Sequence, residues 1–462
     1  MIATLLGGRG RPRGILGGID RALGHLLSFE AAFVLFLYSN ELQWIMPARL
    51  PVDETALFGA LSILGAAWVV WREGLYLRGL PVAAAGLLFI AWAVASAAWS
   101  PSRILVDTAV SYLLVFNVLC VVAGALVVAN RRERAVRFFA LALGVAAVMA
   151  AVGLFIYAAY GDFRRWSGWQ DAAGRVYLDF GHTVVNGAGI AFCVALFARL
   201  GSLRQAAGAA LFVACSLFLL VGGGRGPFLG VALAAMVGLA TRPPTAGRGR
   251  VELPYATAAA VLLIAAGAAY VAYVLASGGM TTTLARFAKL MDEADNPSMI
   301  RGANRFAYWS AAYQYWLSAP LFGHGLSSFS VLFHGGREVD GTHPHNIILQ
   351  IAAETGVVGL ALFGLFAWAA LRNAPYRRLR RDPLLVCTLL FVCTSMMAAM
   401  FGKDIVGVRR FFFALSLLAL RPPPPRPGAA GREEDDEEDG EAEAEGPPGV
   451  VPAPPATAGR RR

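Results

Sequence analysis

Long uninterrupted apolar segments restrict the fold of this chain more than any other feature. Segments of about 20 apolar residues match the hydrocarbon thickness of a bilayer, where only helices or closed barrels satisfy their own backbone hydrogen bonds. The segments are continuous rather than alternating, which indicates helices. Apolar residues make up 57% of the sequence and the mean hydropathy is +0.58, values that exclude an ordinary soluble protein. The sequence therefore predicts an all-α, polytopic membrane bundle.

The apolar segments predict about twelve transmembrane helices. They cover residues 28–46, 56–71, 80–99, 104–129, 135–159, 183–200, 205–222, 227–240, 255–277, 346–371, 384–402 and 406–420. The eighth and the twelfth have the least defined bounds, because the eighth is short and the twelfth contains Arg409 and Arg410. The cysteines all lie inside these spans without metal or disulfide spacing, and we expect them to be small core residues.

Arginines in the short loops predict the orientation, because cytoplasmic loops collect positive charge. With the N-terminus inside, the arginines of five connecting loops fall on the cytoplasmic side. They are Arg72 and Arg78; Arg131, Arg132 and Arg134; Arg199 and Arg204; Arg242, Arg248 and Arg250; and Arg377, Arg378, Arg380 and Arg381. The net charge of +10 follows mostly from this topology, so we expect no nucleic-acid partner.

This topology divides the chain into successive parts. Residues 1–27 form a cytoplasmic N-terminal segment, in which we expect no signal peptide, and residues 28–277 contain helices one to nine. Residues 278–345 form a large outer loop with amphipathic helices, and residues 346–420 contain helices ten to twelve. The tail 421–462 is rich in proline and acidic residues and is predicted to be cytoplasmic and disordered.

The outer connections contain arginine, against the trend of the charge rule. Arg225 lies in GGGRGP, where a guanidinium beside a helix N-terminus would suit an anion. The alternative is a tight hairpin whose arginine reaches the lipid headgroups. The loop 160–182 offers charged residues that could bind an anionic lipid or phosphates, or could serve as interface anchors. These residues are Arg164, Arg165, Arg175, Asp179 and His182.

The segment THPHN, residues 342–346, places two histidines directly before an apolar helix. The helix is expected to begin near His345 or Asn346, since Pro344 disfavours helix at His343. Asn346 starts a polar stripe that continues at Gln350 and Glu354, and intramembrane polar groups normally face a bundle interior or a wet cavity. An imidazole there would suit a general base, although a structural histidine is the common alternative.

These residues carry a family resemblance. His345 and Asn346 are followed by nine residues and then by GVVG, which resembles the signature of bacterial O-antigen ligases in the O-antigen ligase/polymerase superfamily. The GGGRG turn, the segment RFAYW with Arg305, and APLFGHGLSSF before the histidines support the resemblance.

The resemblance implies a glycosyltransferase of the bacterial inner membrane whose active site faces the periplasm. It would move a glycan from undecaprenyl pyrophosphate to a sugar hydroxyl of lipid A–core, in lipopolysaccharide biosynthesis, by a metal-independent inverting displacement without a cofactor. Relatives that share the donor are polysaccharide polymerases and protein O-oligosaccharyltransferases, and both remain alternatives. An anion transporter using the polar stripe is the alternative of a different class.

The chemistry assigns a role to each candidate residue. The acceptor hydroxyl must lose a proton, for which we select His345 as the base, and His343 is a lesser candidate. Arg225 and Arg305 would neutralise the pyrophosphate leaving group. Further substrate-binding candidates are Arg301, His343, Asn346, Arg175, His182, Arg164 and Arg165. Asp292, Glu293 and Asp295 could hold a divalent cation, but a solvated helix end fits them better, so no metal is predicted.

Overall fold

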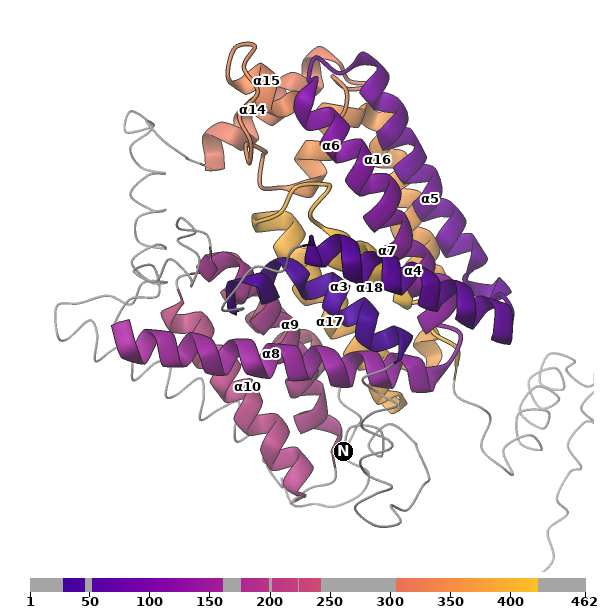
Figure 1. Ribbon diagram of the computed structural model, residues 1–462, viewed down its shortest axis with the longest axis vertical. Coiled ribbons are helices and arrows are strands. Elements are labelled where there is room, and N and C mark those ends of the chain that lie inside the picture. The colour runs from indigo at the N-terminus through magenta and orange to yellow at the C-terminus, as the bar shows by residue number, and fades with distance from the viewer. Residues whose placement is uncertain are drawn as a thin grey trace, which may run out of the picture. The chain divides into compact units, whose positions relative to one another are not determined.

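The structure is a computed structural model that describes residues 28–45, 52–160, 176–198, 202–222, 224–241 and 305–422. Every regular element within these ranges is a helix, which confirms the all-α prediction (Figure 1). The predicted tail 421–462 lies almost entirely outside the described residues, as do the predicted span 255–277 and the first 27 residues.

The helices follow one another along the described chain as numbered in Figure 1. They are α3 (Phe29–Leu42), α4 (Glu54–Glu73), α5 (Leu80–Ala95), α6 (Ile104–Tyr112), α7 (Val118–Val122), α8 (Arg132–Tyr160), α9 (Val176–Phe197), α10 (Leu203–Val221), α11 (Arg225–Ala240), α14 (Arg305–Ser318), α15 (Ser328–Phe333), α16 (Ile347–Asn373), α17 (Pro383–Phe401) and α18 (Arg409–Leu417). Two π-helical segments, Leu113–Asn117 and Ala123–Val128, make α6 and α7 parts of one helical stretch.

Eight helical stretches of the described chain are long and apolar enough to cross a membrane. They are Glu54–Glu73, Leu77–Trp99, Ile104–Val128, Arg132–Tyr160, Asp179–Phe197, Leu203–Val221, Ile347–Asn373 and Pro383–Phe401. Helix α11 is apolar but has only 16 residues. The predicted first and last spans form α3 and α18, which have only 14 and 9 residues. The predicted number of twelve spans is therefore not confirmed.

Helix α18 carries two buried arginines. Arg410 forms an ion pair with Glu41 of α3 and donates to Thr183, and its guanidinium lies 5.0 Å from the ring centroid of Tyr38. Arg409 lies 5.0 Å from the ring centroid of Phe36. Buried cations of this kind are held inside a bundle by neighbouring helices rather than exposed to lipid.

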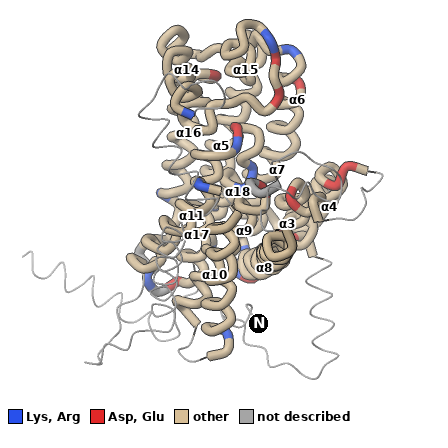
Figure 2. The backbone as a smooth tube through the Cα atoms, turned by 90° about the vertical axis from the view of Figure 1, so that its left-hand side faces the viewer, with Lys and Arg blue, Asp and Glu red and all other residues tan. Residues whose placement is uncertain are grey.

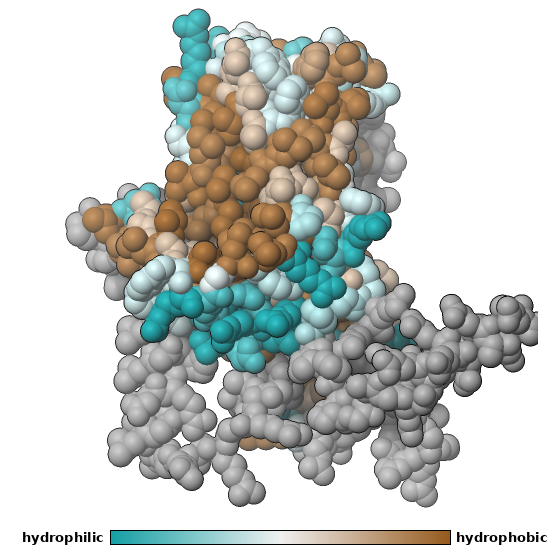
Figure 3. Space-filling model, turned by 90° about the vertical axis from the view of Figure 1, so that its right-hand side faces the viewer, coloured by the Kyte–Doolittle hydropathy of each residue, from teal (hydrophilic) through white to brown (hydrophobic). Residues whose placement is uncertain are grey.

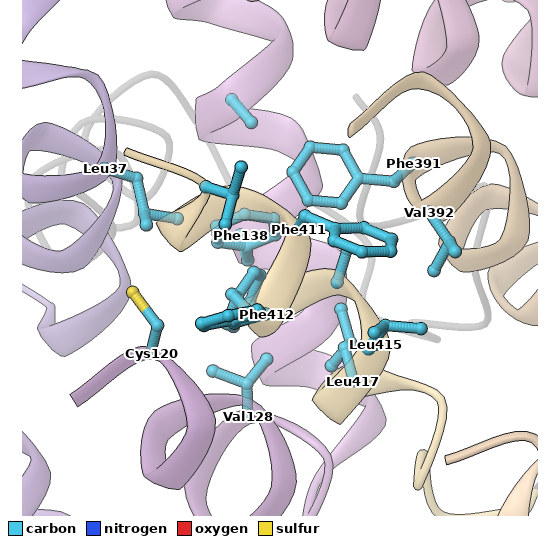
Figure 4. Packing of buried hydrophobic residues seen from close by; sticks show 14 of the residues in the cluster. Leu37, Cys120, Val128, Phe138, Phe391, Val392, Phe411, Phe412, Leu415 and Leu417 are labelled. Atoms are coloured by element: carbon cyan, nitrogen blue, oxygen red, sulfur yellow. The ribbon is translucent and has the colours of Figure 1, made fainter. Parts of the chain in front are cut away.

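The centre of the bundle is an aromatic core where α3, α8, α17 and α18 meet. The ring of Phe138 lies 4.6 Å from that of Phe413 and 5.7 Å from that of Phe391, and Phe33 lies 4.9 Å from Phe413. Figure 4 shows Phe138 and Phe391 beside residues of α18, with Cys120 at the edge of the cluster. All five cysteines are buried and unbridged, as expected of small core residues.

Helix α16 is interrupted at Gly356, where the backbone has φ 69° and ψ −167°. The sequence predicted an unbroken helix here. The carbonyls that the break releases accept other donors: the N–H of His324 donates to Ala353, that of Gly325 to Glu354, and the Trp92 indole to Thr355. A Cβ at position 356 would lie 2.2 Å from the carbonyl oxygen of Leu321, so only glycine fits.

Charged residues gather at two ends of the helices. At one end, Arg134 forms ion pairs with Glu30 (2.8 Å) and Glu73 (2.7 Å), and Arg132 pairs with Asp382 (2.5 Å). This ion-paired end carries arginines of the loops predicted to be cytoplasmic. Figure 2 shows long uncharged stretches of helix between the charged segments, and Figure 3 shows a broad apolar face bordered by hydrophilic residues. Both patterns suit a membrane protein.

Helix α5 connects this end of the bundle to the other. It begins beside Gly79, which packs against the backbone of Ala125, and the chain continues to Trp99, whose indole donates to Gly323. Ser100 donates to the carbonyl of Leu326 (2.6 Å), so the segment APLFGHGLSSF is fixed on the far end of α5. That end contains the cavity described next.

Candidate active site

A cavity of about 760 Å³ lies at this second end. Residues of α6, α9, α14 and α16, of the segment 327–345 and of the turn 402–406 form its wall. The ionisable side chains in the wall are His182, His334, His343, His345, Asp179, Asp340, Glu354, Asp404 and Lys403. Four of the six histidines of the chain therefore face one cavity.

The THPHN segment enters this cavity directly before α16. The ring centroids of His343 and His345 are 4.1 Å apart, and that of Tyr308 lies 6.0 Å from His345. His345 has a φ of 53°, a left-handed conformation that is uncommon outside glycine and clusters at functional sites. Asn346 is the N-cap of α16, so the predicted helix start is confirmed.

Asn346 uses its side-chain oxygen for this cap. Its Oδ1 accepts from the N–H groups of Ile348 and Leu349, both at 3.1 Å. These bonds give the residue a structural role, and the predicted contact with substrate stays a prediction.

His343 is held against the turn that follows α17. Its Nε2 donates to the carbonyl of Gly402 over 3.4 Å. Burial lowers the pKa of His343 below its ordinary value, although Asp404 and the Gly402 carbonyl act in the opposite direction. The imidazole is therefore neutral near pH 7 and keeps its hydrogen bond to Gly402 as an N–H donor.

His182 of α9 lies against the same turn. It is buried, and a Cβ on Gly402 would lie 2.5 Å from its Nε2, so the close approach depends on glycine. Arg410 and Arg305 lie within electrostatic range of its ring. Gly402 thus brings together His182 and His343, which the sequence had suggested from two separate loops.

Lys403 and Asp404 follow Gly402 and were not selected from the sequence. Lys403 Nζ lies 2.7 Å from Asp179 Oδ1, and the Trp44 indole donates to Asp179 Oδ2 at 3.3 Å. Asp404 accepts from the N–H of Gly407 at 2.8 Å. The only sequence signal was a pair of charged residues between two apolar spans.

The polar stripe of α16 forms part of the cavity wall. Gln350 Nε2 donates to both carboxylate oxygens of Glu354 at 3.3 Å, and Gln350 Oε1 accepts from the N–H of Ile405 at 3.0 Å. Both side chains are buried. The stripe therefore joins the first half of α16 to the turn that contains Lys403.

The two predicted catalytic arginines lie beside the cavity rather than in its wall. Arg225 is the first residue of α11. Pro227, two residues later, packs against Gly181, the neighbour of His182. Arg305 begins the described part of α14, and Tyr308, three residues later, lines the cavity. Neither arginine is among the lining residues.

Several predicted residues lie outside the described part of the chain. They are Arg164, Arg165, Arg175 and Arg301, together with Asp292, Glu293 and Asp295. Among the described residues no three His, Cys, Asp or Glu side chains are grouped so that they could hold a metal ion.

The fold and the cavity define a polytopic helical membrane protein with a histidine-rich polar site at one end. Residues 210–364 match the model of the O-antigen ligase family, whose members are glycosyltransferase-like enzymes. This segment extends from α10 into α16 and includes Arg225, Arg305, His345 and Gly356, so the resemblance seen in the sequence is confirmed for it. No match was found among curated proteins.

Proposed function

We propose that the protein is an O-antigen ligase. It transfers a glycan from undecaprenyl pyrophosphate to a sugar hydroxyl of lipid A–core at the periplasmic face of the bacterial inner membrane. The observation that carries this proposal is the position of His345: it lies in the wall of a polar cavity, in the segment that matches the family, next to a second histidine at 4.1 Å.

His345 is the general base of the proposed reaction. The acceptor oxygen forms a bond to the anomeric carbon on the face opposite the leaving group, and the carbon–oxygen bond to the diphosphate breaks, with inversion. The proton of the hydroxyl passes to His345, because imidazole is the side chain most often used for proton transfer near neutral pH. Undecaprenyl pyrophosphate leaves with the electron pair of the broken bond.

Arg225 and Arg305 are the proposed counter-charges of that leaving group, with Arg301. Diphosphate needs no general acid once its charge is neutralised, and a planar guanidinium grips two phosphate oxygens at once. Arg225 is supported by its place at the start of α11, where the backbone N–H groups of the helix also favour an anion.

The distribution of arginines supports the proposed orientation, with the ion-paired end in the cytoplasm and the cavity outside. Single cysteines at exposed positions test it: Arg337→Cys near the cavity and Arg372→Cys at the other end. An impermeant thiol reagent, added to cells with a permeabilised outer membrane, should label the first and not the second. The reverse pattern would reject the orientation.

A deletion strain tests the activity itself. A ligase deletion leaves lipid A–core without glycan while finished glycan accumulates on the carrier lipid. A polymerase deletion leaves single repeat units on lipid A–core, and a protein oligosaccharyltransferase deletion affects glycoproteins alone. Purified protein that transfers glycan in detergent, where no gradient exists, would exclude the transporter.

A chelator tests the prediction that glycan transfer requires no metal ion. Transfer by the purified protein should persist in excess EDTA, because arginines carry out the charge neutralisation. Loss of transfer with EDTA and its recovery with magnesium would instead support a cation at Asp292, Glu293 and Asp295.

A further inference from the structure

Lys403 is a cation in the cavity wall. Among the described lining residues it is the single Lys or Arg, and it shares the wall with four carboxylates. An anionic group that enters the cavity therefore meets the ammonium group of Lys403 in the described part of its wall, to which Arg225 and Arg305 do not belong.

The backbone around Lys403 is fixed from several sides. The N–H groups of Gly402 and Lys403 both donate to the carbonyl of Ala398, at 2.9 and 3.0 Å. His343 donates to Gly402 and His182 packs on it, and Lys403 lies within electrostatic range of both imidazoles. The lysine stem therefore starts from a defined point between the two histidines.

Asp179, the ion-pair partner of Lys403, would keep a hydrogen-bond donor if the lysine moved away. Asp179 holds Lys403 through Oδ1 and the Trp44 indole through Oδ2, so a donor remains on the carboxylate when the ammonium moves. The side chains of Lys403 and Asp179 are 23% and 17% exposed, so water reaches both.

The ion pair Arg132–Asp382, at the ion-paired end, is less accessible to water than the pair Lys403–Asp179. Asp382 is only 2% exposed, and its carboxylate also accepts from the N–H groups of Leu384 and Leu385 as the cap of α17. Neither residue lines the cavity. That pair is part of the fixed structure, whereas the pair at the cavity is open to exchange.

We propose that Lys403 binds a phosphate oxygen of the lipid-linked donor, and that Asp179 is the counter-ion which this phosphate displaces. The proposal rests on the proposed function, since that function supplies the diphosphate. A lysine suits such an exchange, because its ammonium is a point charge on a flexible stem. The donor diphosphate takes over the contact of Lys403, and Asp179 keeps its bond to Trp44.

If a phosphate displaces Asp179 from Lys403, substitutions of these two residues should change the affinity for the donor in opposite directions. Lys403→Gln removes a charge-assisted hydrogen bond to phosphate and should weaken binding about 10- to 100-fold. Asp179→Asn keeps an oxygen for the Trp44 indole but removes the competing charge, so binding should tighten about threefold to tenfold. Lys403→Arg should retain most of the affinity.

The test measures the affinity of the full-length protein in detergent for undecaprenyl pyrophosphate without glycan. Asp382→Asn is the matched control, with an ion pair broken at the other end and no change in affinity expected. Equal weakening in Lys403→Gln and Asp179→Asn, with recovery in the double variant, would mean a structural pair and would overturn the inference.

Two further results separate this inference from the proposed function. Unchanged affinity in Lys403→Gln overturns the role of Lys403 while the proposed function stands. A wild-type protein that does not bind undecaprenyl pyrophosphate overturns both. Melting temperatures of all variants identify any loss of affinity that follows from unfolding.

Discussion

At the ion-paired end of the bundle, Arg134 contacts Glu30 and Glu73, and Arg132 contacts Asp382, so opposite charges neutralise one another between helices. At the cavity end, histidines and carboxylates line open volume, and Lys403 and Asp179 form the one ion pair in that wall among the described residues. The first arrangement holds helices together. The second leaves polar groups available to a substrate, which is why function is expected at one end only.

The comparison predicts its largest effect for His345. His345→Ala should lower the rate of glycan transfer about 10²- to 10⁴-fold, because the base is lost. Binding of donor lipid should persist, since the cations remain. The control is His334→Ala, which removes another cavity histidine that is bonded to Thr342 at 3.1 Å. If His345→Ala transferred glycan at the normal rate, the role of this imidazole would be structural, and the proposed functional difference between the two ends would be contradicted.

Substitutions at the ion-paired end should lower the free energy of unfolding rather than the rate of glycan transfer. Asp382→Ala leaves Arg132 without its carboxylate and α17 without its cap, and should cost about 3–5 kcal/mol of unfolding free energy. Arg131→Ala should cost less than about 1 kcal/mol, because the Arg131 side chain is 55% exposed in its pair with Glu73. Thermal melting in detergent measures both. A fall in transfer by folded Asp382→Ala would show that this end takes part in catalysis.

The interruption of α16 predicts a smaller effect on stability. Gly356→Ala should cost about 2 kcal/mol or more, since alanine disfavours the positive φ and its Cβ would meet the Leu321 carbonyl. Gly364→Ala, in the second half of the same helix, meets no atom within 4 Å and should stabilise the helix by about 0.5–1 kcal/mol. Equal melting temperatures for the two variants would contradict the observed break.

His343 predicts the smallest effect, a dependence of stability on pH. The folded protein holds the pKa of His343 below its ordinary value of 6.5, so the unfolded chain takes up the proton first as the pH falls. Stability should therefore decrease from about pH 6.5 down to the lower folded pKa. His343→Gln should melt with a shallower pH dependence over this window. A steeper one would mean that the folded state favours the imidazolium.

The sequence predicted the helices and the polar stripe because periodicity and composition are local properties. Gln350 and Glu354 stand four residues apart on one helix, so their common face follows from spacing alone. The break at Gly356 was missed because GVVG continues the apolar pattern, and hydropathy does not report a backbone dihedral angle. The break becomes possible only with hydrogen-bond partners that folding brings in, from the segment 320–325 and from Trp92.

The missed residues depend on contacts between distant parts of the chain. Lys403 became a candidate only when folding placed it 2.7 Å from Asp179, and Arg410 could be explained only by its pairing with Glu41. Neither partner is visible in the local sequence. The predicted roles of His345, Arg225 and Arg305 are chemical, and they stay predictions until the variants are measured.

The break in α16 at Gly356 also affects how a tilt of this helix in the membrane is transmitted to the cavity. A continuous helix of 27 residues would transmit any tilt imposed by bilayer thickness straight to the histidines at its N-terminus. Here hydrogen bonds hold both sides of the break on the segment 320–325: the N–H groups of Val357 and Val358 donate to its carbonyls, and the carbonyls before the break accept from its N–H groups. A tilt of the second half is therefore shared with this segment before it reaches His345, so we expect transfer to vary little between thin and thick bilayers.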